Sequence, residues 1–389
     1  MNGLKNIYRI ALRECGILAH NPIYWFCMLV FPVLVTFFFT SLMGEGEPEN
    51  MPCGVIDLDK TATTRAMIRR LDAFQTTRVA AYYNNVNEAR QAIQRGEIYA
   101  FLYIPRGTTA KMQSGRQPDM SFYYSSVSMV AGSLTFRDMK TVTSLGAAGI
   151  GAAKLSALGK TEKEIEAFLQ PTLIDLHMVG NPWGNYNIYL SSVMIPGILM
   201  LFIFLITVYS IGNELKFGTS REWLAMAGDN IFVAVVGKLL PQFLVFLSIM
   251  YGFLWYTFGH LAFPHPGGVG IIMLLGLLSV LGAQGFGVFM FGLMPSLRMA
   301  MSMCSLWAVL GFSLSGATFP VFAMDPMIEA MSWLFPLRHY YMIYQVCIFN
   351  GYPLIDVWMN VVVLVAFFML PCLTLWHLRK AMLEYEYIP

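Results

Sequence analysis

The stretch YNIYLSSVMIPGILMLFIFLITVYSIG, residues 186–212, contains no charged side chain. A helix needs roughly 20 apolar residues to cross the hydrocarbon core of a bilayer, and this stretch is long enough. Of the 389 residues in the chain, 57% are hydrophobic and only 12% are charged. A soluble domain usually carries about twice that share of charge. The stretch is therefore predicted to be one span of a membrane protein.

Further apolar runs of similar length lie on both sides of this span. HLAFPHPGG, residues 260–268, ends one of them with two prolines and two glycines, which are strong breakers of regular structure. The sequence thus predicts a membrane all-α protein with six transmembrane helices, at residues 23–43, 186–212, 231–259, 269–294, 299–319 and 356–376.

The charged residues are concentrated between the first two predicted spans. Residues 44–181 hold 29 of the 48 formally charged side chains. Strand-like runs such as CGVIDLD and TRVAAYY alternate there with helix-like runs such as TATTRAMIRRLDAF. This alternation favours an inserted α/β domain, followed by long helices that lead back to the membrane, over residues 44–185.

Lysine and arginine in short loops indicate which side of the membrane each loop faces. If the N-terminus is cytoplasmic, the outer loops of the membrane part hold only Arg338. The inner side then holds nine basic residues: Lys5, Arg9, Arg13, Lys216, Arg221, Lys238, Arg298, Arg379 and Lys380. The bias predicts a multi-pass protein with both termini in the cytoplasm, including a tail at 377–389, and with the 44–185 domain outside the cytoplasm.

Residues 1–22 have an amphipathic helical pattern. Lys5, Arg9 and Arg13 are four residues apart and form a basic stripe. An apolar stripe consists of Leu4, Ile7, Tyr8, Ala11, Cys15 and Leu18. We expect a helix that lies at the cytoplasmic interface of the membrane. A plain basic flank that only sets orientation is the alternative.

The sequence lacks the patterns of several kinds of catalytic and binding site. GKT, residues 159–161, would need a glycine at position 154 to complete a phosphate-binding loop, and that residue is Lys154. The histidines lack paired metal-ligand spacing, and a net charge of +2 gives no argument for nucleic acid. Arg338 and His339 form a compact polar cluster, which could serve a membrane enzyme but is more typical of an interfacial anchor. We expect that the chain alone is not an enzyme and holds neither a cofactor nor a metal.

Few polar groups lie inside the predicted spans. Gln242, Gln284, Ser302 and Thr318 are candidates for lining a substrate pathway. The fourth and fifth spans lack the ionisable groups that ion-driven transporters usually keep in mid-membrane, which argues against a secondary transporter. Apolar spans suit an amphipathic or lipid-like cargo, and they suit lipid-facing helices equally well.

Three stretches have distinctive patterns. VIDLDKTATTRAMIRRLDAF begins the predicted α/β domain, ELKFGTSREWLAM lies between the second and third predicted spans, and SGATFPVFAMDPMIEAMSWLFPLRHY follows the fifth. Together they resemble type-2 ABC exporter permeases, in particular the bacterial subgroup with a large periplasmic domain after the first span. The matches to the family's charged segment between spans two and three are Glu214, Gly218, Thr219, Glu222 and Leu224. The matches to the family's segment after span five are Ser315, Gly316, Pro320, Met324, Pro326, Pro336 and Leu337.

The resemblance implies a division of labour between subunits. Residues 213–230 would form a cytoplasmic coupling helix that docks on a separate ABC ATPase, which binds the ATP and Mg. Lys216, Arg221, Trp223 and Leu224 would join the matched residues there. Residues 320–352 would form two re-entrant half-helices that close the exit. One departure is that Lys216 and Phe217 stand where the family often has a second acid, so the docking charges would differ.

The resemblance also implies a pathway between two permease chains, as a homodimer or with a related paralogue, in the bacterial inner membrane. A periplasmic adaptor is a further possible partner besides the lipid bilayer. The cargo of this subgroup comprises drugs, antibiotics, ions or lipids. The alternative is a non-transporting module that transmits ATPase motion to its outer domain or to a periplasmic partner.

Overall fold

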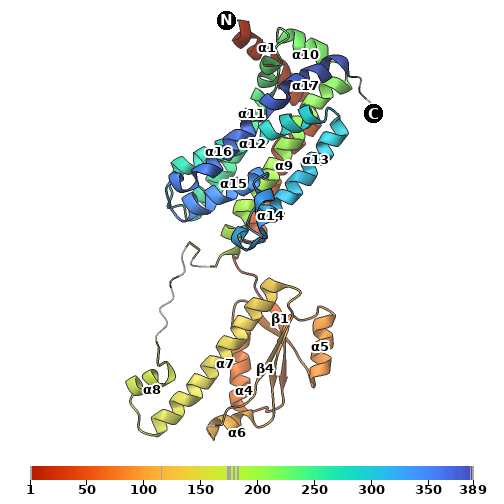
Figure 1. Ribbon diagram of the computed structural model, residues 1–389. Coiled ribbons are helices and arrows are strands. Elements are labelled where there is room, and N and C mark those ends of the chain that lie inside the picture. Colours follow the sequence, from red (N-terminus) through yellow and green to blue (C-terminus); the bar gives the residue numbers. More distant parts are fainter. Residues whose placement is uncertain are drawn as a thin grey trace. The chain divides into compact units, whose positions relative to one another are not determined.

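The structure is a computed structural model that describes residues 2–114, 116–172, 177, 180–181, 184–385 and 387. The chain divides into two compact units, Met1–Gly44 with Met178–Pro389, and Glu45–His177. We call them the membrane unit and the α/β unit, and describe each by itself (Figure 1). Parts of the predicted segments at 1–22, 44–185 and 377–389 lie outside the described residues.

The described residues of the membrane unit form helices joined by turns and loops. Its helices are α1 (Asn2–His20), α2 (Pro22–Trp25), α3 (Phe31–Leu42), α9 (Tyr186–Lys216), α10 (Ser220–Met226), α11 (Ile231–Trp255), α12 (Val269–Leu293), α13 (Leu297–Leu314), α14 (Pro326–Ser332), α15 (Pro336–Ile343), α16 (Trp358–Met369) and α17 (Pro371–Glu384). Short π-helical or 3₁₀ segments are η1 (Phe26–Val30), η2 (Tyr256–His260), η3 (Val321–Ala323), η4 (Tyr344–Phe349) and η5 (Leu354–Val357).

Six helical segments of the described chain are long and apolar enough to cross a membrane, as predicted: Pro22–Leu42, Tyr186–Lys216, Ile231–His260, Val269–Leu293, Leu297–Leu314 and Leu354–Glu384. Three ends differ from the prediction by four residues or more, and one of them is that of the second helix, which continues to Lys216 rather than to 212. The fifth helix stops at Leu314 rather than at 319, because Gly316 adopts a left-handed conformation (φ 96°) that ends the helical path. The sixth continues to Glu384 rather than to 376, with an interruption at Leu370 before Pro371.

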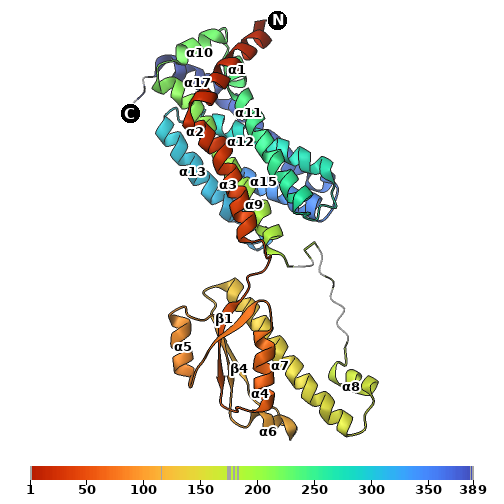
Figure 2. The same ribbon diagram turned by 180° about the vertical axis from the view of Figure 1, so that it is seen from behind.

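Helix α9 forms the centre of the membrane unit, and it lies against α12 and α13 (Figures 1 and 2). Gly287 of α12 allows close contact with α9, since a Cβ there would lie 2.9 Å from Thr207 and 3.2 Å from the Phe204 carbonyl. Close approach through small residues is a common basis for association between helices in membranes.

The first helix differs from the predicted amphipathic pattern. Leu4, Tyr8 and Cys15 of the predicted apolar stripe are exposed, whereas Ile10 and Glu14 are fully buried. A Cβ at Gly237 of α11 would lie 2.9 Å from Ile10, so α1 packs directly on α11. The buried face of α1 therefore binds protein, and the exposed apolar stripe is the face still available to an interface with lipid.

The α/β unit has a four-stranded sheet in the order β2-β1-β3-β4. The strands are β1 (Met51–Asp57), β2 (Thr77–Tyr82), β3 (Ala100–Ile104) and β4 (Ser121–Tyr124), and only β4 is antiparallel to its neighbour. Its helices are α4 (Ala62–Asp72), α5 (Val86–Gln94), α6 (Thr108–Gln113), α7 (Met129–Ala157) and α8 (Glu162–Leu169). Helices α4 and α7 cover one face and α5 the other, which confirms the predicted α/β architecture (Figure 1).

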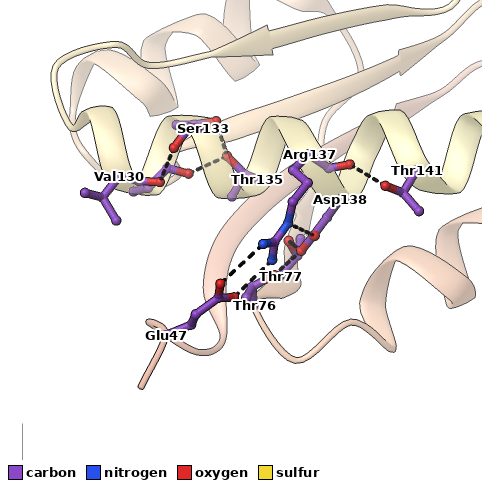
Figure 3. Close-up of polar contacts among 11 residues, drawn as sticks. Glu47, Thr76, Thr77, Val130, Ser133, Thr135, Arg137, Asp138 and Thr141 are labelled. Atoms are coloured by element: carbon purple, nitrogen blue, oxygen red, sulfur yellow. Dashed lines mark hydrogen bonds and ion pairs between the residues drawn. The ribbon is translucent and has the colours of Figure 1, made fainter. Parts of the chain in front are cut away.

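Polar contacts fix α7 to the start of β2. The buried Asp138 carboxylate accepts hydrogen bonds from the hydroxyls of Thr76 and Thr77, the latter at 2.7 Å (Figure 3). Arg137 forms an ion pair with Glu47 at 3.1 Å. The long helix is thereby held to both the sheet and the segment that enters the unit.

A second carboxylate ties together the carboxyl ends of β1 and β3. Asp59 accepts hydrogen bonds from the backbone N–H groups of Gly107 and Thr109, at 2.7 and 2.9 Å, and from the Thr109 hydroxyl at 2.6 Å. Burial acts to raise the pKa of Asp59, but the hydrogen bonds from Thr109 and Gly107 outweigh it and leave the pKa below its ordinary value.

Candidate functional site

The predicted coupling segment contains a short helix, α10, between two glycines. Gly218 precedes α10 with φ 69°, and Gly228 follows it with φ 68°. Left-handed backbone of this kind carries little cost for glycine and lets the chain reverse direction on both sides of a seven-residue helix. The expected short helix between Gly218 and Gly228 is therefore present.

The two faces of α10 differ in burial. Arg221, Glu222 and Ala225 are exposed, and so are Lys216 and Gly218 in the approach to the helix. Trp223 and Leu224 are buried at 0% and 1% exposure. The expectation that these two apolar side chains are available for docking is wrong, because they already anchor α10 to the membrane unit.

Trp223 and Ser220 make the anchoring specific. The indole Nε1 of Trp223 donates to the Ala234 carbonyl of α11 at 3.2 Å. The Ser220 hydroxyl donates to the Met382 carbonyl of α17 at 2.7 Å. Arg221 also reaches the Leu383 carbonyl at 3.3 Å. Helix α10 is thus joined to both the third and the last spanning segments.

Beneath α10 lies a buried charge cluster, which we define as Arg13, Glu14, Glu214 and Lys238. The Lys238 ammonium lies 2.5 Å from Glu14 and 2.7 Å from Glu214. The Arg13 guanidinium donates two hydrogen bonds to Glu214, at 2.8 and 3.1 Å, in the bidentate geometry that makes such pairs strong. The cluster joins α1, the end of α9 and α11.

Burial makes the balance of charge in this cluster important. Glu14, Glu214 and Lys238 are each at most 3% exposed, and the four side chains together carry no net formal charge. Burial raises the pKa of Glu14, and the Lys238 ammonium opposes that effect. The loss of any one charge would leave another buried without its partner, which is costly.

The cluster extends to α10 through two contacts. The Thr219 hydroxyl, directly before α10, donates to Glu214 at 2.5 Å. The Lys238 ammonium lies 5.4 Å from the centroid of the Trp223 ring, within the range of a cation–π interaction. These contacts connect α10 to α1, α9 and α11 through the charge cluster.

Sequence reasoning missed Glu14 and counted Lys238 among the basic residues of the inner side. It also placed Glu214 among the docking residues, whereas the side chain is buried within the charge cluster. One signal was present in the sequence. Glu14 is the single acidic residue among the first 44, and Lys238 lies in an otherwise uncharged span, so each requires a partner when buried.

The segment after span five forms the short helices η3, α14 and α15, while its re-entry into the membrane and its role at the exit stay predictions. Ser315 and the turn at Gly316 end α13, and exposed Pro320 precedes η3. Pro326 and Pro336 occupy the first positions of α14 and α15, where proline fits without loss of a hydrogen bond. Pro336 and Leu337 are buried, and a Cβ at Gly197 of α9 would lie 2.9 Å from Leu337. This segment therefore packs on the central helix.

The four pathway candidates do not share one environment. Gln242 is fully buried on α11, and neither amide atom has a partner among the described residues. Gln284 is 5% exposed on α12, whereas Ser302 and Thr318 are exposed. The single chain thus places two candidates inside the helix bundle and two on its outside.

Arg338 and His339 are buried structural groups, so the interfacial-anchor interpretation is wrong. The two ring nitrogens of His339 lie 2.8 Å from Asn360 and 2.9 Å from the Trp333 carbonyl. Arg338 donates to the Glu329 carbonyl at 2.9 Å. Both ring nitrogens of His339 are thus engaged with other groups of the protein.

Comparison with known proteins covers most of the chain. The family model described as "ABC-2 family transporter protein" matches residues 22–376. The linearmycin resistance permease protein LnrN of Bacillus subtilis (strain 168) is 21% identical over 300 residues, which covers 72% of this chain and 75% of that protein.

Proposed function

The chain belongs to the ABC-2 family of transporter proteins, and from that premise we propose that it is the permease subunit of an ATP-driven exporter. Membership in the family makes it a multi-pass transmembrane transport component and implies association with an ATPase subunit. The proposal adds the direction of transport and the chemical class of the cargo. The cargo is an amphipathic or lipid-like compound that leaves the cytoplasm or the inner leaflet.

The observation that supports the proposal most directly is the difference between the two faces of α10, one exposed and the other packed on the membrane unit. Its outer face presents Arg221 and Glu222, which can form charged contacts with a partner. Its inner face is fixed by Trp223 to α11, and the adjoining Thr219 contacts the charge cluster. We propose that the ATPase docks on the outer face, and that the inner contacts carry its motion into α1, α9 and α11.

Export of a drug-like cargo is supported by the relative described as a linearmycin resistance permease. Resistance to a compound is consistent with its removal from the cell. Within the membrane unit, the buried amide of Gln242 has no hydrogen-bond partner among the described residues and is suited to contact a polar part of such a cargo.

The arrangement in the cell follows from the same proposal. The end of the membrane unit that carries α10 faces the cytoplasm of a bacterium, together with both chain termini, and the α/β unit faces the periplasm. A second permease chain, identical or related, completes the pathway. ATP and Mg bind to the ATPase subunit.

The test is reconstitution of the permease with its ATPase in proteoliposomes. Linearmycin and a panel of amphipathic drugs should move only when both subunits and ATP are present. An ATPase variant without its phosphate-loop lysine is the control, since it should abolish movement without a change in the permease. ATP turnover that no cargo stimulates would favour the non-transporting module instead.

A further inference from the structure

A groove lies on the membrane unit between α11, α12 and the α16–α17 segment, and its volume is about 410 Å³. Helix α12 lies against α11, α16 and α17 (Figure 1). The floor is formed where α12 meets the interruption before Pro371. A Cβ at Gly285 would lie only 2.4 Å from the Phe367 carbonyl, so the backbones meet there.

The wall of this groove consists almost entirely of carbon. Its side chains include Val236, Leu240, Phe368, Cys372 and Leu375, and Gln284 is the one amide among those that line it. Leu240, Phe368 and Cys372 are exposed, so the groove opens on the outside of the membrane unit. The medium around a spanning segment is hydrocarbon, so the occupant with matching chemistry is an acyl chain.

Basic side chains follow the groove-lining residues along α17. Arg379 follows Leu375 by four residues and Cys372 by seven, so the three lie on one face of α17. Arg379 and Lys380 are exposed, although Lys380 also pairs with Glu384 at 3.8 Å. Trp376 is 78% exposed beside them, as expected for a side chain at the boundary between hydrocarbon and headgroups.

We infer that the groove binds an anionic phospholipid, with an acyl chain along α11 and α12 and the acidic headgroup on Arg379 and Lys380. Juxtamembrane basic residues favour anionic over neutral lipids in this way. The bound lipid is a resident ligand at the periphery of the bundle, distinct from the exported cargo. The inference goes beyond the proposed function, and its test needs no ATPase.

The test uses the full chain with Cys372 as its single cysteine, labelled with a small fluorophore. The protein is reconstituted in mixtures of phosphatidylcholine and phosphatidylglycerol, in which one lipid or the other has brominated acyl chains that quench the label. Phosphatidylglycerol should bind the site more tightly than phosphatidylcholine, and the ratio of their binding constants should be about fivefold for each basic residue engaged. Quenching by brominated phosphatidylglycerol should be stronger accordingly. Replacement of Arg379 and Lys380 by Gln should remove the preference while both lipids still quench.

Two controls separate the site from general lipid contact. A label at Val362→Cys, exposed on α16 and far along the last span from Arg379, should show equal quenching by both lipids. The charge-conserving variants Arg379→Lys and Lys380→Arg should keep the preference. Equal quenching at Cys372, or a preference that survives the Gln variants, would overturn the inference. Absence of quenching by either lipid would also overturn it, because protein such as a second copy would then cover the groove.

Discussion

Lys238 of α11 and Glu14 of α1 form a buried ion pair at 2.5 Å, although 224 positions separate them in the sequence. Glu214 shares the same ammonium and joins α9 to the pair. This contact makes the amino-terminal helix part of the helix bundle. It also lies directly beneath α10, the segment that we propose as the ATPase contact.

The first prediction concerns the stability that depends on Lys238. Lys238→Met should lower the free energy of unfolding by about 3–5 kcal/mol, because Glu14 and Glu214 would remain buried without their shared cation. The double variant Lys238→Met/Glu14→Gln should recover part of this loss. Thermal unfolding in detergent, followed by tryptophan fluorescence, measures both. Glu384→Gln, which breaks the exposed Lys380–Glu384 pair, is the matched control and should leave stability nearly unchanged. A loss of equal size in that control would contradict the account.

The second prediction concerns the outer face of α10. Glu222→Lys should reduce cargo export strongly while ATP turnover by the assembled complex continues, because an exposed docking charge is reversed and no buried contact is broken. The measurement compares drug resistance of cells with ATPase activity of the purified complex. Glu166→Lys, an exposed reversal in the α/β unit, is the control. Unchanged export in the Glu222 variant would argue against the docking role.

The third prediction concerns the inner face of α10. Trp223→Ala removes a fully buried ring and should cost about 3–5 kcal/mol of folding stability. Trp223→Phe keeps most of the packing but loses the hydrogen bond to Ala234, at a cost of about 1 kcal/mol. The thermal unfolding temperature should therefore fall more in Trp223→Ala than in Trp223→Phe. If both left stability unchanged, Trp223 would not anchor the helix.

The fourth prediction concerns acid sensitivity of the α/β unit. Because the folded pKa of Asp59 lies below its ordinary value, the carboxylate contributes stability above that ordinary value, about 3.9, and loses it as pH falls through the folded pKa. Asp59→Asn should lower stability at neutral pH and flatten its dependence on acid. Cys53, fully buried and the single cysteine of the unit, reports unfolding through an acid-active disulfide reagent. Parallel acid profiles for wild type and Asp59→Asn would refute the assignment.

Some features could be predicted from local sequence and others could not. The spans follow from apolar runs such as 186–212, and the bounds of α10 follow from Gly218 and Gly228, since each depends only on neighbouring residues. The Glu14–Lys238 pair depends on the packing of helices that are distant in the sequence. The periodicity of the local sequence does not indicate which helices pack together. In α1 both faces carry apolar side chains, so the pattern alone could not show that Ile10 is buried while Leu4 is exposed.

The same limit applies to the candidate site. In a helix as short as α10, the sequence does not distinguish an apolar side chain that contacts a partner from one that packs on its own bundle. Trp223 packs on its own bundle. Arg338 and His339 are typical of an interface by residue type. Their burial depends on the carbonyls of Glu329 and Trp333, which α14 and its end supply only after the chain has folded.

The most direct measurement of the central claim is site-specific photo-crosslinking on α10, in cells that co-express the permease and its ATPase. A photoreactive amino acid in place of exposed Ala225 should capture the ATPase subunit, identified by mass spectrometry. The same residue in place of buried Leu224 should capture only the permease itself. Capture of the ATPase from Phe168 of the α/β unit, with none from Ala225, would contradict the account.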